Sequence, residues 1–199
     1  FNGYYSLNEN EYAVITTFGK TSSVTESGPH FKIPFVQQVR KVSKEIKGMS
    51  IGYDLETGES IERESLMITK DYNFVNVDFY IEYRVVDPIK YLYNANQPLS
   101  ILKNLAQSYI RDTVGSYTVD DVITTGKAEI QSVVKEKLTA RIESEDIGIM
   151  IMNVTIQDAE PPTVAVSEAF KSVETAKQGA DTAINNANKY ASEKLPAAE

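Results

Sequence analysis

The sequence predicts an α+β fold: mainly an antiparallel sheet with packed helices, followed by a long carboxy-terminal helix of the coiled-coil type. Three observations predict it. Residues 75–85 alternate apolar and polar side chains, which is typical of a half-buried antiparallel strand. Residues 98–110 and 127–145 instead space apolar side chains three and four positions apart, as on one face of a helix. Beyond Pro161 the same spacing becomes a heptad repeat.

The chain before the long strand carries shorter strand signals. Residues 12–18 alternate, and so do residues 38–47, whose many charges predict an exposed strand. Between them, the polar residues 21–27 run into Gly28-Pro29, which predicts a loop closed by a turn. Residues 50–64 hold two glycines and five acidic side chains among few apolar ones, so we expect a solvated excursion there.

The second half of the chain opens at Asp87-Pro88, where strand character ends. Pro98 suits the first turn of the helix over 98–110, because a proline there removes no helical hydrogen bond. Thr118 and Asp121 have the spacing of a capping box. Gly148 is the expected terminator of the helix over 127–145.

A last strand is expected over residues 149–157, before the heptad helix. Its alternation puts one apolar set on a single face: Met150, Met152, Val154 and Ile156. The chain is therefore expected to divide into a strand-rich first half of one domain (1–88), a helix-rich second half with a closing strand (89–160), and the start of the heptad helix (161–199).

The composition excludes many kinds of chemistry. The 199 residues include no cysteine and one histidine, so cysteine nucleophiles, disulfides, cysteine zinc sites and two-histidine metalloprotease sites are ruled out. No glycine-rich phosphate loop occurs either. With 28 acidic and 20 basic residues the net charge is −8, which argues against nucleic-acid binding and against charge attraction to an anionic membrane.

Few residues remain as candidates for catalysis or metal binding. His30 is either a general base or a turn histidine packed beside Phe31, and without a serine elbow the second interpretation is favoured. Asp71 and the pair Asp120-Asp121 fit turns and helix caps better than acid-base work. The acidic loop lacks the ordered spacing of a calcium site, so a solvated charge run is favoured for Asp54, Glu56, Glu59, Glu62 and Glu64. We therefore assign no catalytic, metal or cofactor site.

Two apolar segments are candidates for contact. The first comprises Phe31, Ile33, Pro34 and Phe35, which either pack in the core, as a short proline-containing segment favours, or enter a membrane interface. The second is a seam with 3-4 spacing: Val166, Ala169, Val173, Ala176, Ala180, Ala183, Ala187 and Tyr190, with Phe170 and Ile184 flanking it. Alanines bury little area and an isolated helix of this length is marginal in water, so the seam needs a partner.

Several motifs in order resemble the stomatin/prohibitin/flotillin/HflK-HflC family, whose shared domain is called SPFH or Band 7. They are residues 7–14 (LNENEYAV), 17–20 (TFGK), 28–35 (GPHFKIPF), 66–71 (LMITKD) and 83–88 (YRVVDP), with Ile110-Arg111 and Val114-Gly115. Further segments look most like the HflK branch: 50–53 (SIGY), 117–120 (YTVD), 161–164 (PPTV) and 188–190 (NKY).

This resemblance implies a non-enzymatic, membrane-anchored scaffold without a cofactor. It implies a transmembrane helix upstream of Phe1, a cell-membrane location in a bacterium with the domain on the extracytoplasmic face, and a long helix that assembles subunits. The implied partners are the bilayer, an HflC-like subunit and a membrane AAA protease of the FtsH type, which the assembly modulates.

The residues leave other functions open. The chain could be a soluble binding module whose last helix folds back on its own domain. It could also organise membrane microdomains, as stomatins and prohibitins do, without a protease partner. The third alternative is a hydrolase that uses His30.

Overall fold

The computed structural model describes residues 3–162 and 164–194, except for some side chains of the last helix. The chain forms two compact units, Phe1–Glu160 and Pro161–Glu199, which are described separately below. The elements of the first unit are β1 (Tyr4–Leu7), β2 (Glu11–Thr17), β3 (Lys20–Val24), β4 (Gly28–Phe31), β5 (Gln37–Ser43), β6 (Lys47–Ile51), α1 (Glu62–Ser65), β7 (Leu66–Ile68), β8 (Phe74–Val85), α2 (Pro88–Tyr93), α3 (Pro98–Val114), α4 (Val119–Ile123), α5 (Lys127–Glu145) and β9 (Ile149–Glu160).

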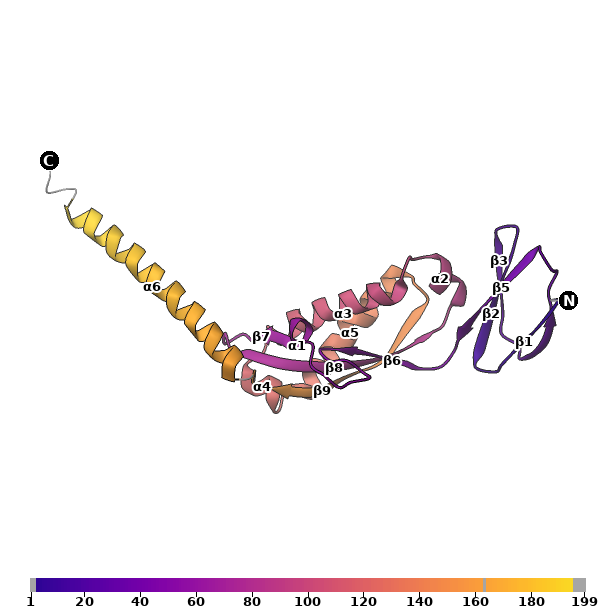
Figure 1. Ribbon diagram of the computed structural model, residues 1–199, viewed down its shortest axis with the longest axis horizontal. Coiled ribbons are helices and arrows are strands. Elements are labelled where there is room, and N and C mark those ends of the chain that lie inside the picture. Colours follow the sequence, from indigo (N-terminus) through magenta and orange to yellow (C-terminus); the bar gives the residue numbers. More distant parts are fainter. Residues whose placement is uncertain (1–2, 163, 195–199) are drawn as a thin grey trace. The chain divides into compact units, whose positions relative to one another are not determined.

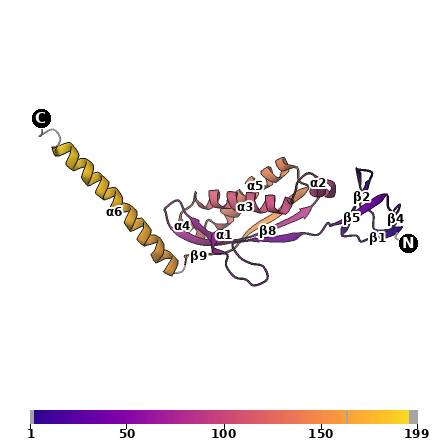
Figure 2. The same cartoon turned by 45° about the horizontal axis from the view of Figure 1, so that its top comes forward.

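A sheet covered by helices forms the larger part of the first unit. Strand β8 is its centre: β9 pairs along one edge, while β6 and β7 share the other, all antiparallel. Helices α3 and α5 lie along one face of this sheet (Figures 1 and 2). We call this part, residues 46–160, the helix-covered sheet. The α+β fold with antiparallel sheets and several helices is thereby confirmed.

The core lies between β8 and the two helices. The odd-numbered residues of β8 face it, as their alternation predicted, and Phe79 is completely buried. Leu102 and Ile110 from α3, and Ile130 and Leu138 from α5, pack in the same cluster. Each fully buried side chain of this size contributes about 1.5–3 kcal/mol relative to exposure, so this layer supplies most of the burial energy of the unit.

The first five strands form a smaller group with two pairings. Strands β3, β2 and β5 form one antiparallel sheet in that order, and β1 pairs with β4 in a separate ribbon. We call residues 3–43 the N-terminal strands. Tyr93 of α2 connects this group to the helix-covered sheet: its hydroxyl shares a 2.9 Å hydrogen bond with the Thr16 hydroxyl, and the Arg40 guanidinium lies 5.8 Å from its ring centroid.

The loop expected over residues 21–27 is wrong in its first half and at its end. Residues Lys20–Val24 form strand β3, and Gly28–Phe31 form strand β4 instead of a turn. Strand β3 has no apolar face, so alternation could not reveal it. It exists because β2 turns back through Phe18-Gly19 and pairs with it from Thr17↔Lys20 onward.

The solvated excursion expected over residues 50–64 is also wrong at both ends. Ile51 ends strand β6 and is completely buried. Glu64 lies in the short helix α1 and is buried as well. Its carboxylate forms an ion pair with Lys103 at 2.9 Å and accepts a hydrogen bond from Gly52 N at 3.4 Å, and these contacts satisfy the buried charge. The middle of the segment is the exposed loop that the sequence predicted.

The strand after α5 does not keep one apolar face. Two register irregularities in the β8–β9 pairing leave Met152 and Gln157 without direct partners, and each bulge reverses the alternation. Consequently Ile149, Ile151, Val154 and Ile156 are buried, whereas Met150 is exposed. The expected end of α5 also differs, since Asp146, with φ of 52°, is the C-cap in place of Gly148.

The other helical expectations are confirmed. Helix α3 begins at Pro98 and α5 spans Lys127–Glu145. Thr118 caps α4, because its Oγ1 accepts a 3.3 Å hydrogen bond from Asp121 N. The second unit contains α6 (Val164–Lys194), a helix where one was expected after the double proline; its coiled-coil type stays a prediction.

Candidate functional site

Exposed apolar side chains gather where β2 ends and β5 begins. Thr17, the last residue of β2, pairs with Gln37, the first residue of β5, so the two turns flanking these strand ends are neighbours. One turn carries Phe18, which is 87% exposed; the other carries Phe35, which is fully exposed. We name the whole set the apolar tip: Phe18, Phe31, Ile33, Pro34 and Phe35.

The Gln37 side chain holds the two turns together. Its Oε1 accepts a 2.9 Å hydrogen bond from Ile33 N, and its Nε2 donates a 3.2 Å hydrogen bond to Thr17 Oγ1. The backbone of Gln37 also donates to the Ile33 carbonyl at 3.0 Å. The two turns of the apolar tip are therefore held in place by hydrogen bonds, and their phenylalanines point outward into solvent.

Two of the displayed phenylalanines have unfavourable backbone conformations. Phe18 has φ of 47° and Phe35 has φ of 66°, in the left-handed region. Phe18 and Gly19 together form the tight turn of the β2–β3 hairpin, where asparagine or glycine is the usual residue. A bulky residue there costs about 1–2 kcal/mol. Neither burial nor turn geometry accounts for phenylalanine at these positions, which indicates a contact with something other than the described residues of this unit.

The structure exposes the segment for which two interpretations were open. Phe31 is 87% exposed and Ile33 is 57% exposed, so core packing within this chain is wrong. Phe18 completes the cluster and was not predicted, because the alternation over residues 12–18 indicates only the end of a strand. The Phe-Gly pair after an alternating strand was the available signal.

His30 lies in β4 and makes structural contacts. Its Nε2 is 2.8 Å from the Glu26 carbonyl, and its ring stacks on Tyr5 with the centroids 5.4 Å apart. Neither neighbour is an activated hydroxyl nucleophile. The geometry thus favours the packed strand histidine over the general base.

The exposed part of the acidic loop is a hydrogen-bonded turn. Asp54 Oδ1 accepts from the backbone N–H groups of Thr57 and Glu56, both at 2.9 Å, and these bonds lower the pKa of Asp54. Asp71 has a similar role, because its carboxylate accepts from Thr69 Oγ1 and from Val119 N and so joins the β7–β8 turn to α4. Within residues 3–162 and 164–194, no cluster of three or more acidic or histidine side chains could hold a metal ion.

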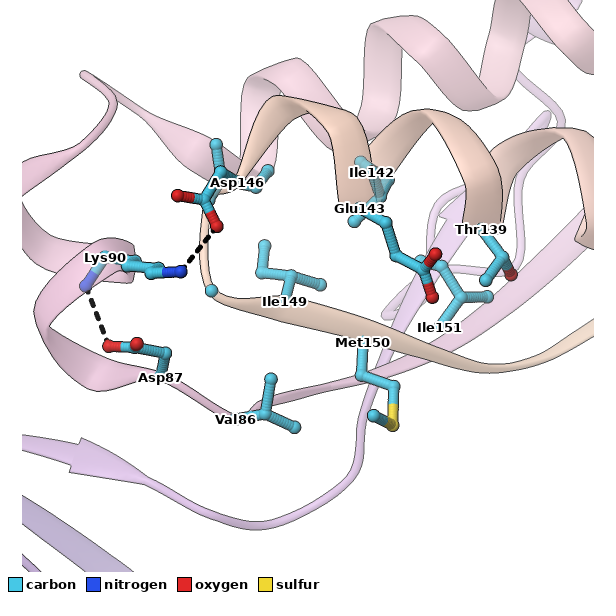
Figure 3. Close-up of a pocket in the computed structure, with 12 residues that line it drawn as sticks. Val86, Asp87, Lys90, Thr139, Ile142, Glu143, Asp146, Ile149, Met150 and Ile151 are labelled. Carbon is cyan, nitrogen blue, oxygen red and sulfur yellow. Dashed lines mark hydrogen bonds and ion pairs between the residues drawn. The ribbon is translucent and has the colours of Figure 1, made fainter.

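A hollow of about 200 Å³ lies where β8 leads into α2 and α5 into β9 (Figure 3). Its floor is aliphatic, and Met150 is 44% exposed beside it. At its rim Lys90 Nζ lies 2.6 Å from Asp146 Oδ1, which raises the pKa of Lys90, and the Lys90 backbone N–H donates to Asp87 Oδ1. Three of the charged residues, Lys90, Asp146 and Asp87, thus bind one another, and Glu143 also lines the hollow. The hollow is therefore mainly a surface for apolar contact.

The second candidate surface runs along α6. The described seam side chains are all exposed: Ala176, Ala180, Ala183, Ala187 and Tyr190. The side chains of Val166, Ala169, Phe170 and Val173 lie outside the part that the structure describes. None of the described helices is both long enough and apolar enough to cross a bilayer.

The sequence matches a family model described as "SPFH domain / Band 7 family" over residues 5–191. The chain belongs to this family. The match includes the apolar tip, the helix-covered sheet and most of α6. The SPFH domain thus provides the frame on which both candidate surfaces lie.

Curated SPFH relatives share the HflK name. "Modulator of FtsH protease HflK" of Escherichia coli (strain K12) is 32% identical over 197 residues, which are 99% of this chain and 44% of the relative. "Protein HflK" of Vibrio cholerae is 31% identical over 198 residues, 100% of this chain and 47% of the relative. "Protein HflK" of Borreliella burgdorferi is 28% identical over 198 residues, which are 96% of this chain and 64% of the relative. The chain therefore spans about half the length of these relatives.

Proposed function

We propose that this SPFH chain is a non-enzymatic subunit of a membrane-anchored scaffold. The observation that carries the proposal is the apolar tip, where the fold holds strained phenylalanines in the open. A bilayer interface supplies the apolar contact that the described residues of the first unit do not. Gly3 lies beside the tip, since its carbonyl accepts a 3.0 Å hydrogen bond from Lys32 N, so an anchor preceding Phe1 would enter the domain at the bilayer.

The scaffold modulates a membrane AAA protease of the FtsH type. The support for this step is the name of the Escherichia coli relative, a modulator of that protease, at 32% identity over nearly the whole chain. In this proposal an HflC-like subunit is the partner, the domain lies on the extracytoplasmic face of a bacterial cell membrane, and the chain carries out no reaction of its own.

The α6 seam assembles the subunits. Its exposed alanines allow another helix to approach closely, and small contributions add along the repeat. Replacing Val173 and Ala180 by glutamate would place unpaired charge in a packed seam and weaken assembly. Sedimentation of the membrane-anchored protein is the measurement, and an unchanged oligomer in the double variant would contradict the seam.

Vesicle flotation tests membrane contact. We expect the 199-residue chain to float with phosphatidylcholine vesicles and the Phe18→Ser, Phe35→Ser variant to float less, because two apolar side chains no longer enter the interface. A matched variant, Tyr72→Ser, removes an aromatic side chain that is 82% exposed in a different turn, and should float like the parent.

The main alternative is a soluble interaction module. It has one observation in its favour, the apolar hollow beside Met150, which could receive an apolar side chain of a partner. This alternative predicts no flotation for any variant. Co-purification with an FtsH-type protease then separates a protease-linked scaffold from a microdomain organiser that lacks this partner.

A further inference from the structure

The charge of the molecule is unevenly distributed. Residues 1–47 hold six basic and four acidic side chains, a net charge of +2. Residues 48–199 hold fourteen basic and twenty-four acidic side chains, a net charge of −10. The overall charge of −8 therefore conceals a basic segment, and the apolar tip belongs to it.

Within that segment, two lysines lie one or two residues after exposed phenylalanines of the tip. Lys20 comes after the Phe18-Gly19 turn and begins β3, and its side chain is exposed. Lys32 follows Phe31, at the start of the loop that displays Phe35. Lysine stems extend several ångströms, so both ammonium groups can reach the headgroup level when the phenylalanines enter the interface.

Three of the four acidic residues of this segment, Glu9, Glu11 and Glu45, lie at the other end of the strands; the fourth, Glu26, lies between β3 and β4, with its carbonyl 2.8 Å from His30 Nε2. Glu11 begins β2, six residues from Thr17 at the tip end, which is about 20 Å along a strand. Glu9 precedes it, Glu26 follows the end of β3, and Glu45 follows the end of β5.

At that distant end, two of these carboxylates already have partners. Glu11 pairs with Lys41 at 3.3 Å, and Glu45 accepts from Asn10 at 3.2 Å. Since charges are screened over about 10 Å at 0.1 M salt, these acids do not offset the lysines at the tip.

We infer that the apolar tip selects anionic lipid, with Lys20 and Lys32 contacting headgroup phosphates while Phe18, Phe31 and Phe35 enter the interface. The inference rests on the proposed function, because it requires that the tip contacts a bilayer. The acidic remainder of the chain is repelled by the same surface, so an anionic membrane also orients the domain with its tip toward the lipid.

The sequence contains no tryptophan, so Phe35→Trp gives a single tryptophan reporter at the fully exposed position, excited at a wavelength that the twelve tyrosines do not absorb. Titration with vesicles of phosphatidylcholine, and of phosphatidylcholine mixed with phosphatidylglycerol, yields two partition coefficients. Each lysine near an anionic surface strengthens binding by about fivefold, so we expect a ratio of about thirtyfold between the vesicles. Raising the salt concentration should reduce that ratio.

The deciding variant is Lys20→Gln, Lys32→Gln in the reporter chain. We expect the ratio of the two partition coefficients to fall toward one. The matched control, Lys70→Gln, Lys135→Gln, changes the total charge by the same amount at positions away from the tip and should keep the ratio. Circular dichroism melting verifies that both variants fold, and flotation of chains without the tryptophan verifies the reporter.

The outcomes separate this inference from the proposed function. A ratio that falls in the tip variant and not in the control supports anionic selection. A ratio that persists in the tip variant, or falls equally in both, overturns the inference while tip insertion stands. A tryptophan emission that does not shift to the blue with either vesicle overturns the proposed membrane contact, and the inference with it.

Discussion

The N-terminal strands and the helix-covered sheet use the same kinds of residue in opposite ways. Among the described hydrophobic side chains, only Leu7, Ala13, Val14 and Val42 are buried before residue 44, whereas twenty-three are buried from Ile51 to Ala159. Phe79 is completely buried in the second region, and Phe35 is fully exposed in the first. Phe79 therefore contributes to stability, whereas Phe35 is displayed for contact.

The largest expected effect separates these two uses of phenylalanine. Phe79→Ala leaves a cavity under α3 and α5 and should lower the free energy of unfolding by about 3–5 kcal/mol. Phe35→Ala removes a side chain that buries nothing and should change it by less than about 0.5 kcal/mol. Urea unfolding followed by circular dichroism measures both. Comparable losses in the two variants would contradict the distinction between the regions.

A second prediction concerns the contact that joins the regions. Tyr93→Ala removes the hydrogen bond with Thr16 and the ring beneath Arg40, and these are worth about 1–2 kcal/mol together. Because the N-terminal strands have a small core, we expect the loss to appear as faster amide hydrogen exchange in β2, with exchange in α5 unchanged. Tyr93→Phe is the control, since it keeps the ring and should give the smaller effect. Equal acceleration in both elements would show that the two regions open as one.

A third prediction uses the strained turns. Phe18→Asn should stabilise the fold by about 0.5–1 kcal/mol, because asparagine tolerates a positive φ, and should weaken vesicle binding. Tyr72→Asn is the matched variant: Tyr72 has φ of 59° and is 82% exposed in the β7–β8 turn. It should stabilise similarly and leave vesicle binding unchanged. Thermal melting measures the stability and flotation measures vesicle binding. A Phe18→Asn chain that binds vesicles as the parent does would show that Phe18 does not contribute to membrane contact.

Much of the helix-covered sheet could be predicted from the sequence because it is periodic. Strand β8 and helices α3 and α5 each bury one regular face, so their alternation or 3-4 spacing reports their position directly. Strand β9 shows where this fails. Its bulges at Met152 and Gln157 reverse the faces, and a bulge depends on the partner strand as much as on its own residues.

The N-terminal strands were less predictable for a different reason. Strand β3 is polar on both faces, and its existence follows from pairing with β2, a non-local event. The apolar tip was only partly predictable. The sequence identified an apolar segment of Phe31, Ile33, Pro34 and Phe35, but it left open whether these side chains are buried or exposed. Phe18 joins them only because Thr17 pairs with Gln37, twenty residues later in the chain.

The smallest expected effect tests the open face of the helix-covered sheet, where like charges lie opposite one another. Asp78 pairs in register with Asp158, and its Oδ1 is buried without a hydrogen-bond partner. Burial raises the pKa of Asp78, and the nearby charges of Asp158 and Glu160 raise it further. Tyr53 also faces it, from beyond β6.

Because the pKa of Asp78 is higher in the folded state than in the unfolded chain, folding favours the protonated form. Its stabilising contribution is complete below a pH of about 4 and is lost as the pH rises through the folded value. Asp78→Asn should therefore be more stable than the parent at neutral pH and equal to it in acid. The sign should reverse for Asp71→Asn, since hydrogen bonds, first from Thr69, lower the pKa of Asp71. Urea midpoints across a pH series measure both variants, and a pH dependence of the same sign in the two would contradict the opposite pKa shifts of Asp78 and Asp71.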